Sequence, residues 1–154
     1  MRRKDREITD KNEIAEIISR CRVMRLGMCD GGKPYIVPLN FGFDPSENTF
    51  FFHSAKEGTK LDIIRKNPFV FVELDNFLRL CEADEACDFS CIYESVTAEG
   101  TAEVLTDPSE KLRGLKLLML QQTGREFDIP LSAADSVTVV KINISRMTAK
   151  AKRS

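Results

Sequence analysis

The sequence lacks several features that would place it in a familiar class. No apolar run among its 154 residues is long enough to cross a bilayer, and the charged N-terminus does not have the form of a signal peptide. Acidic and basic residues nearly balance, 24 against 23, which disfavours nucleic-acid binding as a global property. We therefore expect a single cytoplasmic domain over residues 1–154 that uses neither a membrane nor nucleic acid as its partner.

Two further absences narrow the chemistry. Neither the G-x-x-x-x-G-K-[ST] phosphate loop nor the G-x-G-x-x-G dinucleotide fingerprint occurs in the chain. His53 is the only histidine, and Cys81, Cys87 and Cys91 lack the paired C-x-x-C spacing of structural metal sites, so we expect no metal site. Five cysteines without an export signal favour free thiols in a reducing compartment over a disulfide framework.

Hydrophobic periodicity and turn residues predict the secondary structure. Three helices are expected, at 11–22, from about 59 to 67 and from 107 to 124. Six strands are expected, at 23–29, 35–43, 49–53, 69–74, 93–105 and 137–144. Residues 76–91 and 125–135 are expected to be irregular. This pattern predicts a mainly β (α+β) fold, an antiparallel barrel with flanking helices.

Individual residues refine this prediction. Gly31 and Gly32 indicate a hairpin turn, because glycine accepts positive φ. Pro38 cannot donate a ladder hydrogen bond, so an edge or a bulge is expected near it. Gly100 lies in the middle of an alternating strand and indicates a bulge or a close backbone approach.

The segment 50–60 is the most informative stretch of the chain. An apolar strand ends in His53-Ser54, and a loop with Lys56 and Gly58 leads into a helix whose first turn carries Lys60. Two lysines beside a helix N-terminus are unfavourable unless an anion binds there. Together with a hydroxyl and free amides they predict a phosphate site; the simpler alternative is a solvated helix start with surface lysines.

A second candidate site is 37–43, where Pro38 interrupts the ladder and Asn40 lies among aromatic residues. Such a wall suits a flat heterocycle that is held by apolar faces and a few polar edge contacts. A barrel strand with a bulge explains the same residues.

His53 is either a packed, hydrogen-bonded residue or one that faces the ligand. The acidic neighbours of Cys81 and Cys87 disfavour a thiolate nucleophile there.

Three ordered motifs resemble the pyridoxamine 5'-phosphate oxidase-like flavoproteins, in particular the nitroimidazole-resistance (Nim-type) branch. They are Arg25-Leu26-Gly27-Met28, then Gly32-Lys33-Pro34-Tyr35-Ile36-Val37-Pro38-Leu39-Asn40-Phe41-Gly42, then Phe52-His53-Ser54-Ala55-Lys56-Glu57-Gly58-Thr59-Lys60. The likeness runs over nearly the whole chain. Two positions depart from the family pattern: Glu94 stands where a basic residue is frequent, and Thr148-Ala149-Lys150 replaces Thr-Gly-Lys.

The resemblance implies an FMN-binding split β-barrel that forms a homodimer with the flavin at the subunit interface. It implies that His53, Ser54, Lys56 and Lys60 hold the phosphate side, and that His53 also faces the active site as the catalytic residue. The segment 38–41 would line the isoalloxazine ring. The matching motifs thus give these cofactor-binding candidates: Pro38, Leu39, Asn40, Phe41, Phe52, His53, Ser54, Ala55, Lys56, Gly58 and Lys60.

The leading hypothesis is an FMN-dependent oxidoreductase that passes electrons to a small acceptor such as a nitroaromatic or a quinone. NAD(P)H would bind only transiently as the donor. One alternative is a flavin-binding carrier or sensor without turnover. Another is a haem-binding split barrel with His53 as the axial ligand. Pyridoxamine-phosphate oxidation is disfavoured, because the arginine-rich substrate signatures of the vitamin-oxidising members are not seen.

Overall fold

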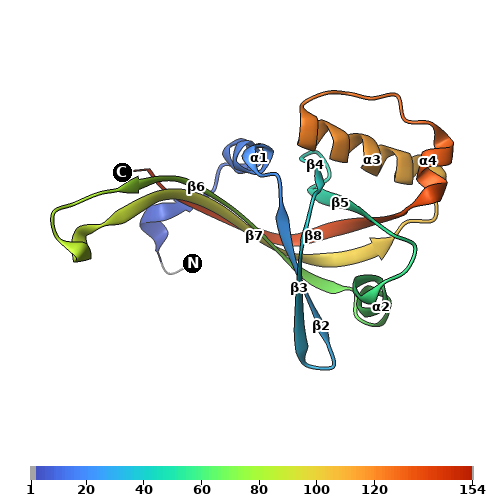
Figure 1. Ribbon diagram of the computed structural model, residues 1–154, viewed down its shortest axis with the longest axis horizontal. Helices are drawn as coiled ribbons and strands as arrows, with labels where there is room; N and C mark the ends of the chain where they lie inside the picture. The colour runs from blue at the N-terminus through green and yellow to red at the C-terminus, as the bar shows by residue number, and fades with distance from the viewer. Residues whose placement is uncertain (1–2, 154) are drawn as a thin grey trace.

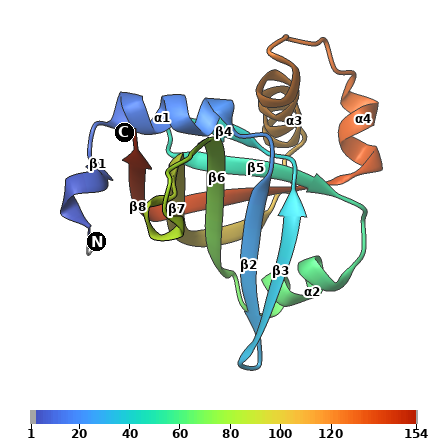
Figure 2. The same ribbon diagram turned by 60° about the vertical axis from the view of Figure 1, so that its left-hand side comes forward.

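The computed structural model describes residues 3–153. They form one antiparallel sheet of eight strands in the order β3-β2-β6-β7-β8-β5-β4, with β1 paired to β8, and the sheet bends around a common core (Figure 1 and Figure 2). The strands are β1 Glu7–Ile8, β2 Met24–Asp30, β3 Lys33–Leu39, β4 Gly42–Asp44, β5 Thr49–Ser54, β6 Phe69–Cys81, β7 Ser90–Val104 and β8 Thr138–Lys152. The helices are α1 Lys11–Arg20, α2 Thr59–Lys66, α3 Pro108–Thr123 and α4 Leu131–Ser136, and two 3-10 turns are η1 Lys4–Arg6 and η2 Ala86–Asp88.

The predicted mainly β class is confirmed, but the predicted number of six strands is wrong for residues 3–153. The expected strand 35–43 is divided, because β3 ends at Leu39 and β4 begins at Gly42 to pair with β5. The edge predicted from Pro38 is confirmed, since β3 is the first strand of the sheet. The glycine turn is also confirmed, with φ of 56° at Gly31 and 87° at Gly32.

Three consecutive phenylalanines of β5 are fully buried, which the alternation of a one-sided strand would not permit. Phe50 and Phe52 belong to the barrel core, whereas Phe51 lies against α3. Gly114 of α3 makes room for the Phe51 ring, because a Cβ at position 114 would lie 2.7 Å from it. Elements therefore cover β5 on both faces, which fixes the strand that carries His53 and Ser54.

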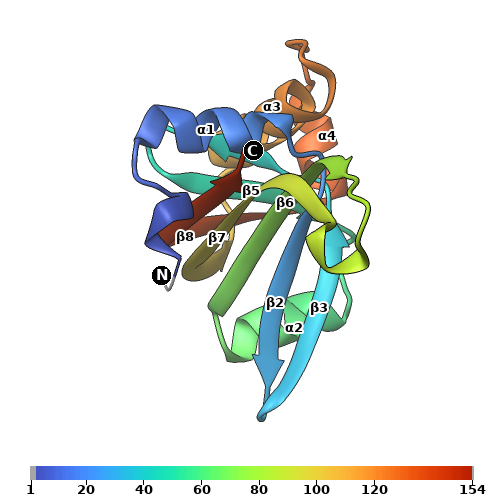
Figure 3. The same ribbon diagram turned by 90° about the vertical axis from the view of Figure 1, so that its left-hand side faces the viewer.

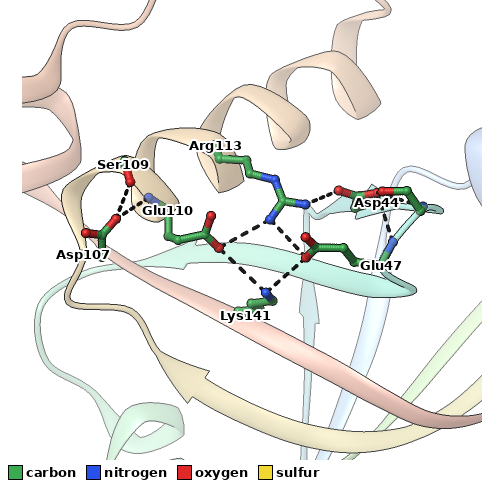
Figure 4. A network of polar contacts seen from close by, with 8 residues as sticks. Asp44, Glu47, Asp107, Ser109, Glu110, Arg113 and Lys141 are labelled. Atoms are coloured by element: carbon green, nitrogen blue, oxygen red, sulfur yellow. Dashed lines mark hydrogen bonds and ion pairs between the residues drawn. The ribbon is translucent and has the colours of Figure 1, made fainter.

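A network of charged side chains fastens α3 to the β4–β5 hairpin (Figure 4). The guanidinium of Arg113 donates to Asp44, to Glu47 at 3.1 Å and to Glu110 at 3.3 Å. Lys141 of β8 donates to Glu47 at 3.2 Å. Arg113 and Lys141 thus both have carboxylate partners.

The prediction that residues 76–91 are irregular is wrong for 76–81 and 90–91, which belong to β6 and β7, whereas 82–89 contains no strand and only the short turn η2. The β6–β7 ladder continues from Phe77↔Tyr93 to Cys81↔Ser90, with a register shift near Leu78. The resulting two-stranded ribbon projects from the barrel on the left of Figure 1. Polar and cysteine-rich composition concealed this pairing, because the sequence does not reveal that the two segments face each other in register.

Two other predictions are corrected at the end of the chain. The expected loop 125–135 contains the short helix α4, and β8 extends to Lys152 instead of ending near Ile144. The second half of β8 pairs with β7, so that Lys150 lies opposite Ser95. Long-range pairing therefore orders a basic segment that by composition resembles a solvated tail. No helix within residues 3–153 has both the length and the apolar character needed to cross a membrane.

An ion pair between the half-exposed Arg20 and the buried Glu94 holds α1 on the barrel, where α1 lies across the top of the sheet in Figure 3. Glu94 of β7 accepts two hydrogen bonds of 2.8 Å from Arg20 and one of 3.0 Å from Asn76. The hydrogen bonds from Arg20 are the main cause that lowers the pKa of Glu94 below its usual value. Beside it, burial raises the pKa of the Cys21 thiol to about 11, which keeps this thiol protonated.

We expect Gly100→Ala to destabilise the protein by about 1–3 kcal/mol. A Cβ at position 100 would lie 2.4 Å from the Asn143 carbonyl oxygen, at the register shift between β7 and β8. Gly27→Ala is the matched control, because its Cβ would meet Phe71 at an ordinary 3.4 Å. Urea unfolding of both variants measures the difference, and equal midpoints would contradict the close approach.

We expect Glu94→Gln to lower the free energy of unfolding by about 1–3 kcal/mol at neutral pH. Because folding lowers the pKa of Glu94, the stability from its carboxylate is present above pH 4.5, the ordinary carboxyl value, and is lost as the pH falls through the lowered pKa. The difference between wild type and Glu94→Gln should therefore shrink in acid.

Glu99→Gln is the control, because Glu99 is exposed and its ion pair with Arg146 is long, at 3.9 Å. Its effect should stay within about 0.5 kcal/mol. Urea unfolding at several pH values provides the measurement, and a pH-independent difference for Glu94→Gln would refute the role of the charge.

Candidate functional site

The junction between β5 and α2 brings the predicted phosphate-binding residues together. Ser54 ends β5, and α2 begins at Thr59 after Gly58. Gly58 has φ of 143°, a conformation that side-chain-bearing residues rarely adopt, although a Cβ there would meet nothing within 4 Å. The glycine is thus required by the backbone path, and its lack of a side chain leaves the first amides of α2 without a side-chain cap.

The two lysines of this junction have no carboxylate partner within 4 Å among residues 3–153. The ammonium group of Lys60 instead donates to the Ser54 hydroxyl at 3.1 Å. Ser54 is buried and Lys60 is half-buried, whereas Lys56 and Ala55 are exposed. An uncompensated ammonium group from Lys60, the Ser54 hydroxyl and the start of a helix therefore meet at one place, with Lys56 in the adjoining loop, and these donors can bind a phosphate.

His53 is exposed and lies opposite Val139 of β8. It occupies the face of β5 opposite to that of Phe52 and Ser54, because successive strand residues alternate. Its imidazole is therefore accessible, but it points to the other side of the strand from the Ser54 hydroxyl that Lys60 contacts. Within residues 3–153 no three His, Cys, Asp or Glu side chains come together as metal ligands.

The segment 38–41 reaches the same region through β4. The turn at Asn40 and Phe41 leads into Gly42, which pairs with Phe51, two residues before His53 (Figure 2). Pro38 is exposed and Leu39 is half-buried. The pairing of β4 with β5 therefore brings the segment 38–41 close to the end of β5, where the predicted phosphate-binding segment begins.

The side chain of Asn40 has a structural role in this turn. Its amide nitrogen donates to the Arg22 carbonyl at 3.0 Å and to Gln122 Oε1 at 2.9 Å. Gln122 of α3 donates in turn to the Phe41 carbonyl at 3.1 Å. These bonds fix the path of the chain between β3 and β4, and a contact of Asn40 with a cofactor stays a prediction.

Phe41 and Phe52 have no exposed surface. Phe41 packs edge-on against Phe50, with their centroids 5.5 Å apart. The two rings support the site from within the core, and their direct contact with a ligand also stays a prediction. The exposed members of the predicted set are Pro38, Asn40, His53, Ala55 and Lys56.

Sequence reasoning missed an apolar hollow of about 640 Å³ on the outer face of the sheet. We call it the outer-face groove, and it is lined by Gly27, Met28, Cys29, Pro34, Ile36, Asn67, Phe69, Val70, Phe71, Glu99, Gly100, Thr101 and Ser145. Ile36, Phe69 and Phe71 are 65%, 70% and 46% exposed. The run Phe69-Val70-Phe71-Val72 is apolar on both faces of the strand, and this was the available signal.

The groove is continuous with the candidate site along β3. Pro34, Ile36 and Pro38 alternate with residues that face the core, and they lie opposite Cys29, Gly27 and Arg25 of β2. Residues two apart on a strand share one face at a spacing of roughly 7 Å. The wall of the groove therefore leads directly to Pro38.

The chain is similar to several known proteins. The family model described as pyridoxamine 5'-phosphate oxidase matches residues 10–151. A candidate 5-nitroimidazole antibiotic resistance protein from Bacteroides thetaiotaomicron is 31% identical, with a TM-score of 0.81, 94% of this chain and 86% of that chain being covered. Among curated proteins none matches.

Two less similar structures share the fold. A FAD-binding protein from Mesorhizobium loti has 22% identity and a TM-score of 0.70, with 96% of this chain and 98% of that chain covered. A flavocytochrome from Azotobacter vinelandii has 17% identity and a TM-score of 0.81, with 100% and 72% covered. The family predicted from the three motifs is thereby confirmed: the chain is a split barrel and belongs to the pyridoxamine 5'-phosphate oxidase family.

Proposed function

We propose that this protein binds FMN and passes electrons from a transient donor, NAD(P)H, to a small acceptor such as a nitroaromatic or a quinone. One observation carries the proposal: Lys60, in the first turn of α2, donates to the Ser54 hydroxyl, and neither it nor the nearby Lys56 has a carboxylate partner in residues 3–153. Membership of a family whose solved relatives include a FAD-binding protein and a candidate nitroimidazole-resistance protein supports it.

The residues of the site fit the two ends of FMN. The terminal phosphate is a dianion, and Lys60, Ser54 and the first amides of α2 offer it an ammonium group, a hydroxyl and backbone donors. Pro38 presents an exposed apolar surface that suits one face of the ring. The flavin, when bound, supplies the redox chemistry.

The chain's own residues would position the cofactor and the acceptor. The hydrogen bond between Lys60 and Ser54 holds the ammonium group at the junction before any anion arrives, which reduces the cost of ordering it. His53, accessible beside the loop, can donate a proton or a hydrogen bond to the oxygen of an acceptor. A homodimer in a reducing compartment such as the cytoplasm belongs to the proposal, in keeping with five free thiols.

The absorption spectrum of the purified protein is the first test of this function. Two near-visible bands of a flavin are expected, and a Soret band would indicate haem instead. Anaerobic addition of NADH or NADPH followed by a nitroaromatic or a quinone should bleach and then restore the flavin bands. Flavin that is reduced but never reoxidised by any acceptor would indicate a carrier or sensor.

We expect Lys60→Glu to raise the Kd for FMN at least about tenfold, since it replaces attraction with repulsion at the phosphate. Lys66→Glu is the matched control, because it makes the same charge change at the opposite end of α2. Its Kd should stay within about threefold of wild type. Fluorescence titration of FMN measures both, and equal losses in the two variants would mean that net charge, and not this site, governs binding.

We expect His53→Gln to slow the oxidation of reduced flavin by the acceptor about 100-fold. FMN affinity should change far less than in Lys60→Glu, since glutamine keeps a hydrogen-bonding side chain at an exposed position. Stopped-flow absorbance follows the reoxidation, and an unchanged rate would remove His53 from the reaction.

A further inference from the structure

Gln122, in the last turn of α3, joins segments that are far apart in the sequence. Its amide nitrogen donates to the carbonyls of Arg22 and Phe41, both at 3.1 Å. Its amide oxygen accepts from the Asn40 amide nitrogen at 2.9 Å, and that nitrogen also donates to the Arg22 carbonyl at 3.0 Å. The two side-chain amides and the Arg22 carbonyl therefore form a closed ring of hydrogen bonds beside the turn between β3 and β4.

This ring determines which end of the Asn40 amide is left for other partners. A backbone carbonyl only accepts, so both amides must turn their nitrogens towards Arg22. The two N–H bonds of Asn40 are then both used, one on Arg22 and one on Gln122. A half rotation of the amide is unfavourable, because it would place the amide oxygen against two acceptor oxygens. Asn40 is exposed, and no group of residues 3–153 donates to its oxygen, so towards a ligand Asn40 is an acceptor only.

The helix that carries Gln122 is held firmly against the barrel. Its backbone lies against Gly42, where a Cβ would come within 2.4 Å of the Leu118 amide nitrogen. Earlier in the helix, the Arg113 network fastens α3 to the β4–β5 hairpin (Figure 4). The position of Gln122 is therefore set by the barrel, and the acceptor is in place before a ligand binds, which lowers the cost of binding.

We propose that Gln122 is a positioning residue of the flavin site: it holds Asn40 so that the amide oxygen accepts a hydrogen bond from N3–H of the isoalloxazine ring. The chemistry of the ring selects this atom, because N3–H is the one N–H group of the oxidised ring and its other polar atoms only accept. Asn40 follows two residues after the exposed Pro38, so one segment can offer the ring both a face and an edge contact. The inference rests on the proposed flavin function and adds the group that recognises the ring edge.

A comparison of FMN with 3-methyl-FMN, in which a methyl group replaces the N3 hydrogen, tests this hydrogen bond in the unaltered protein. Both probes carry the same phosphate, so the contribution of Lys60 cancels in the ratio of their Kd values. Fluorescence titration of the wild type should give a Kd about tenfold higher for 3-methyl-FMN than for FMN, the effect of one lost hydrogen bond. Equal Kd values would overturn the proposal.

Gln122→Leu tests whether the glutamine orients the acceptor. Leucine keeps a helix-forming side chain at this position but removes one of the two partners that hold the Asn40 amide. The Kd for FMN should rise about threefold, and the ratio of the two Kd values should fall to about three or less. A ratio that stays at the wild-type value would mean that the methyl group is excluded by its bulk alone, and Gln122 would then have no positioning role.

Gln121→Leu is the matched control. Gln121 precedes Gln122 on the same turn of α3, and its amide nitrogen donates to the carbonyls of Ile18 and Cys21, each at 2.9 Å, at the end of α1. The substitution removes carbonyl partners as Gln122→Leu does, but none from the turn between β3 and β4. Its Kd ratio should stay within about twofold of the wild-type ratio. Equal falls in both variants would indicate a general loosening of α3 and would refute a specific role for Gln122.

Asn40→Ala removes the acceptor itself and leaves α3 unaltered, so it decides the question even where Gln122→Leu does not fold. Its Kd ratio should be about one, and a wild-type ratio in this variant would overturn the proposal.

The same titrations distinguish failure of this inference from failure of the proposed function. A wild type that binds neither probe refutes the flavin function and the inference with it. A wild type that binds FMN, loses that binding in Lys60→Glu and yet has the same Kd for both probes refutes the Asn40 contact alone.

Discussion

The burial of β5 on both faces is the constraint on which the rest of the structure depends. Phe50 and Phe52 fill the barrel, and Phe51 fits against Gly114 of α3. A shift by one residue would take Phe51 from its place at Gly114 and turn the polar His53 inward. The strand therefore ends at one defined place, with Ser54 buried and His53 exposed. Everything that the site can do follows from this placement.

The cationic side chains near the two ends of β5 differ in their partners. On the side of α3, Arg113 and Lys141 are neutralised by Asp44, Glu47 and Glu110, so that their charges serve to dock the helix. At the start of α2, Lys60 donates to the Ser54 hydroxyl, and neither Lys56 nor Lys60 has a carboxylate within 4 Å among residues 3–153. Surface ion pairs contribute little to stability, but a cation left unpaired beside a helix N-terminus is available to an anion. This difference separates a structural network from a binding site.

The same sheet presents one face to its core and another, partly apolar, to its surroundings. The outer-face groove is part of that second face, and the beginning of β6 lines it. A strand that is apolar on both faces is typical of a sheet covered on both sides. The candidate site borders this face at Pro38, because Pro34, Ile36 and Pro38 lie on the same side of β3.

Sequence alone determined the elements that depend on neighbouring residues. Asp10 and Asp107 accept from the amides of Glu13 and Glu110 at the starts of α1 and α3, and Gly124 ends α3 with φ of 70°. Gly100 marks a register shift, as predicted. Only the tertiary structure decided what depends on distant partners: the pairing of 77–90, the extension of β8 to Lys152, and the engagement of the Asn40 amide by Arg22 and Gln122. Caps and turns are local interactions, whereas strand pairing and the presence or absence of a counter-ion are settled by residues far away in the chain.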